Sequence, residues 1–206
     1  MDLHNYLNYV LIAFFTITSP GAAILLAINT AMSFGLKAVF FSTIGNILGL
    51  FILSSVAMFG VGVLLKTSAV FFIVLKIVGA LYLVYLGILQ ISKKHIKLNS
   101  AKNTNGKGYN LKKVFRKGFL VAITNPKPIL FFSAVFPLFM DNKNSITLQF
   151  FIMTGTFMFI SFCSLMFYGY ISKRAKAWFF DEYKLKIFYK ISGLLFILMG
   201  ILLLFV

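Results

Sequence analysis

The chain has 206 residues, of which 60% are hydrophobic and only 12% are charged, and its mean hydropathy is +0.95. A soluble domain has about 45–50% apolar and about 25% charged residues, so this composition excludes an ordinary soluble protein. The net charge of +16 alone would suit a nucleic-acid-binding protein. The basic residues gather at the ends of apolar runs, however, so we expect a lipid bilayer and no nucleic acid.

Six apolar runs are long enough to cross a bilayer, which takes about 20 residues per helix. In chain order they cover residues 6–31, 37–64, 69–91, 118–140, 146–171 and 184–206. The sequence therefore predicts an all-α polytopic membrane protein with six transmembrane helices. Residues 1–91 would form a first three-helix repeat, 92–117 a basic cytoplasmic loop, and 118–206 a second three-helix repeat.

The distribution of basic residues predicts the orientation of these spans. Nine of the 20 Lys and Arg residues lie between Lys93 and Lys117, and five more lie between Lys173 and Lys186. The connections on the opposite side contain only Lys66 and Lys143. Because basic loops stay in the cytoplasm, we expect both termini to lie outside.

The first and fourth spans are each interrupted by proline. Pro20-Gly21 lies in the middle of the first span, and Pro126 and Pro128 lie about ten residues into the fourth. Proline removes a backbone donor and clashes with the preceding turn, so such a break survives in a membrane only where it faces protein or a watery cavity. We therefore expect spans 1 and 4 to be broken helices.

Short motifs recur in the same order in the two halves, at separations of 106, 110 and 114 residues. The pairs are Thr18-Ser19-Pro20 with Thr124-Asn125-Pro126, Phe40-Phe41 with Phe150-Phe151, and Lys76 to Gly79 with Lys190 to Gly193. Because each half has an odd number of spans, the halves must be inverted relative to each other. Inverted repeats with broken helices at matching positions are typical of secondary transporters, with the substrate between the repeats.

The candidate substrate site lies at these breaks. A helix that restarts after a break offers free N–H groups and a partial positive charge to an anion. Lys127 adds a full charge, since a lysine within a span usually faces a cavity or a partner; snorkelling to the interface is the alternative. The predicted substrate-binding residues are Thr18, Ser19, Pro20, Gly21, Asn46, Thr124, Asn125, Pro126 and Lys127.

Four segments carry a resemblance to a known family over essentially the whole chain. They are SPGAA at 19–23, GNILG at 45–49, KIVGALYLVYLGILQ at 76–90 and GFLVAITNPKPILFFSAVFPLF at 118–139. In these segments the chain resembles the LysE/RhtB family of amino-acid exporters. The resemblance implies export of small amino acids or their derivatives from the cytoplasm across a bacterial inner membrane, driven by the proton gradient.

Two positions depart from that family pattern. Ala22 follows Pro20-Gly21 where members commonly have a second proline, and Asn46 stands where many have aspartate. No carboxylate lies within any apolar run. The substrate ammonium would therefore be held by backbone carbonyls freed at the breaks, and Lys127 is the candidate for carrying a coupled proton.

Other functions find less support in the sequence. A cation or metal exporter of the same architecture is the alternative, but that chemistry favours His, Asp or Glu within the membrane. A thiol-electron carrier needs paired cysteines, and Cys163 is the only one. No constellation of His and carboxylates predicts an enzyme, a cofactor or a metal site. The sequence is compatible with a homo-oligomer as well as with a monomer.

Overall fold

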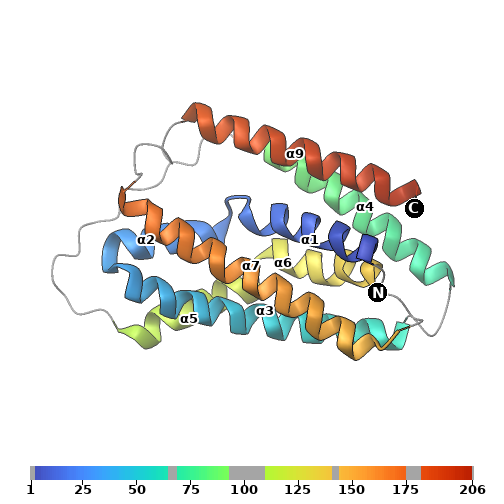
Figure 1. The fold of residues 1–206 in the computed structure, drawn as a ribbon, viewed down its shortest axis with the longest axis horizontal. Helices are drawn as coiled ribbons and strands as arrows, with labels where there is room; N and C mark the ends of the chain where they lie inside the picture. The colour runs from blue at the N-terminus through green and yellow to red at the C-terminus, as the bar shows by residue number, and fades with distance from the viewer. Residues whose placement is uncertain (1–2, 65–68, 93–109, 141–143, 175–181, 206) are drawn as a thin grey trace.

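The computed structural model of this chain describes residues 3–64, 69–92, 110–140, 144–174 and 182–205 (Figure 1). All regular structure in these ranges is helical. By length and composition, two of the described helices can cross a membrane, or up to four spans are present if each of two bent helix pairs counts as one. The chain is thus an all-α polytopic membrane protein, as predicted.

The first span is broken at Ser19–Gly21. Helix α1 (Leu3–Thr18) and helix α2 (Ala22–Phe34) meet at an angle of 49°. Pro20 has no N–H to continue the ladder of α1, and Gly21 is extended with φ −144°. The prediction of a proline break in this span is confirmed.

The next two helices are continuous. Gly35 has a φ of 85°, a conformation that favours glycine, and it turns the chain from α2 into α3 (Leu36–Leu64). Helix α4 covers Ala69–Ile91. These bounds match the expected second and third spans closely.

Helix α5 (Leu111–Thr124) begins seven residues before the expected span start at 118. The Asn110 side chain accepts hydrogen bonds from the backbone N–H groups of Lys112 and Lys113, at 2.9 and 3.3 Å. Such a cap satisfies two of the N–H groups that a helix start leaves without partners. Residues 111–117 are therefore helical rather than part of a loop over 92–117, and residues 93–109 lie outside the described ranges.

The fourth span continues after its break as three short elements. These are α6 (Pro126–Leu130), the π-helix η1 (Phe131–Val135) and the 3₁₀-helix η2 (Phe136–Phe139). The bend between α5 and this segment is 46°. Pro128 and Pro137 each remove a backbone donor, which favours these departures from α-geometry. Helices α7 (Ile146–Arg174) and α9 (Glu182–Phe205) complete the described chain.

Glycines allow two pairs of helices to pack at short range. In the α3–α5 pair, a Cβ on Gly118 would lie 1.9 Å from the carbonyl oxygen of Ser42. In the α4–α9 pair, a Cβ on Gly87 would lie 2.5 Å from the carbonyl oxygen of Gly193. Helices α4 and α9 lie side by side as a layer along one side of the other helices (Figure 1).

The two termini lie at the same end of the molecule (Figure 1). The starts of α3 and α5 lie at the opposite end, beside the end of α7. We call the end with both termini the terminal end, and the end with the starts of α3 and α5 the opposite end.

Candidate functional site

A small cavity lies where the two broken spans meet, and helices α3 and α7 help to enclose it. Its volume is about 50 Å³, which suffices for a few water molecules. The lining residues are Thr16, Ile17, Ser19, Gly21, Ala23, Ile24, Asn46, Leu50, Asn125, Lys127, Pro128, Phe157, Ser161 and Leu165. They come from α1, α2, α3, α6, α7 and the two breaks.

Lys127 joins the two breaks through its side chain. Its ammonium donates to the Ser19 carbonyl oxygen at 3.0 Å and also contacts the Ser19 hydroxyl oxygen. The Asn125 side chain accepts from the Lys127 backbone N–H at 3.1 Å, which caps the start of α6. The break in span 4 thus places a cation against the break in span 1.

Two tyrosines donate to carbonyl oxygens at the breaks. Tyr168 of α7 donates to Thr18 at 2.9 Å, and Tyr82 of α4 donates to Lys127 at 3.1 Å. Together with the Lys127–Ser19 contact, these bonds occupy the carbonyls of Thr18 and Ser19. In this conformation each of the two carbonyl oxygens already accepts a hydrogen bond from a protein donor.

Thr16, Asn46 and Ser161 are buried polar residues that line the cavity, at 2%, 4% and 4% exposure. Among the described residues, the Thr16 hydroxyl has no hydrogen-bond partner. A buried polar group without a partner costs about 1–3 kcal/mol, and such groups are rare in folded proteins. Because these three side chains line the same cavity, their oxygens provide the cavity with neutral hydrogen-bond acceptors that a ligand could use.

The predicted site residues divide into two groups. Ser19, Gly21, Asn46, Asn125 and Lys127 line the cavity. The remaining four support the breaks without lining it: Thr18, Pro20, Thr124 and Pro126.

The two threonines of that second group bond to their own helices. The Thr18 hydroxyl donates to the Phe14 carbonyl and the Thr124 hydroxyl to the Leu120 carbonyl, both at 2.7 Å. Sequence reasoning did not find Thr16 and Ser161 as lining residues. Each is a single small polar residue in an apolar run, and its facing direction depends on how the helices pack.

A cluster of buried aromatic side chains adjoins the cavity at Phe157. Its members are Tyr9, Phe131, Phe132, Phe136, Phe139 and Phe157. The ring of Phe157, which also lines the cavity, lies 4.8 Å from those of Phe131 and Phe132, centroid to centroid. Aromatic pairs at this separation are stabilising beyond their buried area, so this cluster gives the cavity a firmly packed wall at Phe157.

Cavities at the junction of two broken membrane helices are typical of secondary transporters. Comparison with known proteins assigns the family: a model described as LysE type translocator matches residues 14–206. The chain belongs to this family, so it is a translocator rather than an enzyme.

Individual relatives agree with that assignment. The uncharacterized membrane protein YrhP of Bacillus subtilis (strain 168) is 30% identical over 206 residues, covering 97% of this chain and 98% of the relative. Leucine efflux proteins of Klebsiella pneumoniae and Salmonella choleraesuis are 30% and 31% identical over 164 residues, covering 79% of this chain and 76% of each relative. No solved structure matches the chain.

Proposed function

We propose that this protein is a secondary transporter that exports an amino acid with an apolar side chain from the cytoplasm. The observation that carries this proposal is the position of Lys127, whose ammonium reaches across the junction of the two broken spans. A cation there, among neutral polar and apolar side chains, suits a substrate that presents a carboxylate. Similarity to two leucine efflux proteins supports the same class of substrate.

The substrate carboxylate would bind between Lys127 and the start of α2. Gly21, the N-cap of α2, provides no side-chain cap, and Ala23 and Ile24 in its first turn line the cavity. A helix start of this kind attracts anions through its free N–H groups and its dipole. Because Asn125 already caps the start of α6, the start of α2 is the better of the two candidates.

The substrate ammonium would bind to neutral oxygens rather than to a carboxylate. Asn46, Thr16 and Ser161 supply such oxygens in the cavity, and the Thr16 hydroxyl has no hydrogen-bond partner among the described residues. Three neutral acceptors can satisfy the three donors of an ammonium. A neutral set also leaves the site with one net positive charge, which selects for the carboxylate.

The substrate side chain would lie against the apolar part of the lining. Ile17, Ile24, Leu50 and Leu165 form this part. The volume of about 50 Å³ is far below the roughly 300 Å³ at which small-molecule pockets begin. We infer that the structure represents a closed conformation and that substrate binding separates Lys127 from Ser19.

We further propose that export is coupled to the proton gradient and that Lys127 is the coupling group. It is the only ionisable side chain among the lining residues, and no carboxylate lies in any apolar run. The ammonium cannot hold Ser19 and a substrate carboxylate with the same donors at once. In the proposed cycle the Lys127 ammonium leaves the Ser19 oxygens when it binds the substrate carboxylate. This change of partner would couple the protonation of Lys127 to substrate binding and release.

The cation or metal exporter is disfavoured by the same site. Within the described ranges, no group of three or more His, Cys, Asp or Glu residues could hold a metal ion. The positive charge of Lys127 would also repel a cation from this cavity. A cation substrate would need a different site from the one at the breaks.

Cells loaded with dipeptides test the class of substrate. Intracellular hydrolysis raises one amino acid at a time, and its appearance outside is compared between cells with and without the protein. We expect faster export of leucine, isoleucine or valine and no effect on lysine or glutamate. Faster export of charged amino acids only, or resistance to metal ions without amino-acid export, would contradict the proposal.

A further inference from the structure

Exposed cations cover one face of α5 at its start. The four basic residues there are Lys112, Lys113, Arg116 and Lys117, and all are exposed. Residues four apart lie on the same face of a helix, so these side chains form one basic stripe. The other face of the same turns is buried at Val114 and Gly118, where α5 packs against α3.

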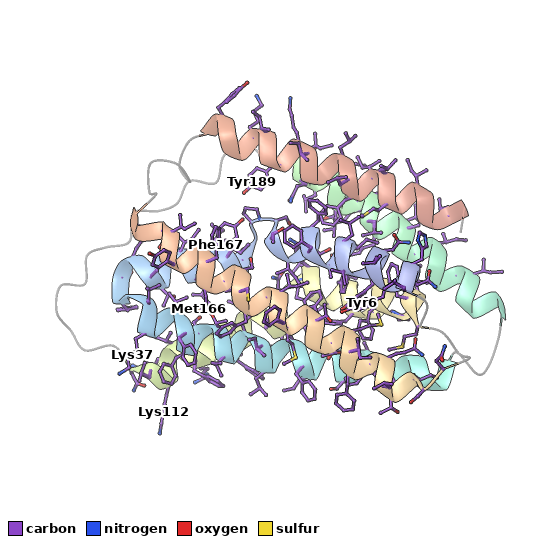
Figure 2. The ribbon with its side chains drawn as sticks, viewed as in Figure 1. Tyr6, Lys37, Lys112, Met166, Phe167 and Tyr189 are labelled. Carbon is purple, nitrogen blue, oxygen red and sulfur yellow. The ribbon has the colours of Figure 1, made fainter. Side chains whose placement is uncertain are left out.

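Lys37 of α3 extends this stripe at the same end of the molecule. Gly118 lies against Ser42, and Gly49 lies against Ala122, so α3 and α5 run in the same direction. Lys37 precedes Ser42 by five residues and Lys113 precedes Gly118 by five. Figure 2 accordingly shows Lys37 and Lys112 at the opposite end, both pointing outward. We call these five residues, Lys37 and the four of α5, the basic patch.

The basic patch has no counter-charge within its own part of the chain. None of its members forms an ion pair with a described residue, and the sequence contains no Asp or Glu between Leu3 and Met140. Like charges four residues apart on a helix repel each other. The positive end of the α5 dipole adds to this repulsion. An anion from outside the chain would relieve it.

The patch also lies directly beside apolar surface. Leu120, three residues after Lys117, is 40% exposed, and Phe40, three residues after Lys37, is 41% exposed. Three residues of helix span about 4.5 Å. The cations therefore lie at the level where an apolar membrane-facing surface begins, which is the level of lipid headgroups.

We propose that the basic patch binds the phosphate headgroups of anionic phospholipids. The charge of the patch matches the headgroup, and the adjoining Leu120 and Phe40 can contact acyl chains, which a soluble anion lacks. Juxtamembrane lysines and arginines attract anionic lipids with a strength that grows with their number. A bound lipid would also hold α5, whose other end leads through Asn125 into the cavity.

Lipid binding to the purified protein tests this proposal without reference to transport. The protein is titrated in detergent with phosphatidylglycerol or phosphatidylcholine, and bound lipid is measured by native mass spectrometry. The variant K113Q/K117Q is compared with K186Q/K190Q of α9. Each pair lies four residues apart on exposed positions, and each removes two charges.

We expect K113Q/K117Q to weaken phosphatidylglycerol binding by at least about tenfold. K186Q/K190Q should change it by less than about twofold, and phosphatidylcholine should bind weakly throughout. The charge-conserving variant K113R/K117R should retain binding, which separates loss of charge from damage to the fold. Equal losses in both Gln variants, or displacement of the lipid by inorganic phosphate at equal concentration, would overturn the proposal.

Discussion

Thr16 and Thr43 are two buried threonines whose hydroxyls have no hydrogen bond within the described chain. They are 2% and 1% exposed, but only Thr16 lines the cavity between the broken spans. Replacing each threonine in turn therefore distinguishes two effects of the hydroxyl. Both changes remove a buried hydroxyl without a partner, but only the change at Thr16 removes one that could bind the substrate. Because valine has nearly the same shape, either Thr→Val change should leave the fold intact or stabilise it slightly.

We predict that Thr16→Val lowers the export rate about tenfold, whereas Thr43→Val leaves it unchanged. The loss of one hydrogen bond to a charged group, about 1.5 kcal/mol, gives a factor of this size. Export from dipeptide-loaded cells measures the rates, and thermal unfolding of the purified variants controls for folding. Equal export in the two variants would remove Thr16 from the binding site.

Tyr168 shows how one side chain supports a break. Its hydroxyl donates to the Thr18 carbonyl at the end of α1. We predict that Tyr168→Phe lowers the free energy of unfolding by about 1–3 kcal/mol, because it removes a donor from a carbonyl that the break deprives of its helical partner. Tyr85→Phe, at a 56% exposed position of α4, should be neutral. Thermal unfolding in detergent compares the two variants, and equal melting temperatures would contradict this role.

At the scale of the elements, close backbone contact holds α5 against α3. A Cβ on Gly118 would lie 1.9 Å from the Ser42 carbonyl oxygen, whereas a Cβ on Gly155 would meet nothing within 4 Å. Small residues at such crossings allow membrane helices to approach closely. We therefore expect a Gly→Ala substitution to have opposite effects on stability at these two positions.

We predict that Gly118→Ala destabilises the protein by at least about 1–3 kcal/mol, the usual cost of overpacking. Gly155→Ala should be neutral or slightly stabilising, because alanine favours the helix. Melting temperatures of the purified variants provide the measurement. A Gly118→Ala protein with the parental melting temperature would show that α3 and α5 are not held this closely.

Proline made the broken elements predictable from the sequence, because its missing N–H acts locally. Pro20 and Pro126 therefore located both bends. The start of α5 was placed too late because Lys112 to Lys117 resemble a loop when only hydropathy is considered, and the Asn110 cap was overlooked. The π-helical and 3₁₀ turns after Leu130 were not predicted, since they arise from packing around Pro128 and Pro137. Packing also decides that Thr16 and Ser161 face the cavity.

In the molecule as a whole, both termini lie at one end and the starts of α3 and α5 lie at the other (Figure 1). We predict that the termini lie outside and that the connection between α4 and α5 lies in the cytoplasm. Single cysteines introduced at Ser100 and Asn144 in a Cys163→Ser background should react with a membrane-impermeant thiol reagent from opposite sides. Labelling of both from the same side would contradict the orientation and the inverted repeat together.

In the proposed transport cycle, Lys127 binds the substrate carboxylate at the junction of the two broken spans. The most direct measurement is leucine export from dipeptide-loaded cells that carry Lys127→Met, with Lys190→Met, at an exposed position of α9, as the matched control. Both changes remove one lysine charge from the protein. The amount of each variant in the membrane is measured in parallel.

We predict that Lys127→Met abolishes export while the protein stays folded in the membrane, and that Lys190→Met exports at the parental rate. Lys127→Arg should retain only part of the activity, because a planar guanidinium does not replace a compact ammonium. If coupling also depends on Lys127, any residual export by the Met variant should lose the parental dependence on pH. A Lys127→Met protein with the parental export rate and pH profile would contradict the account.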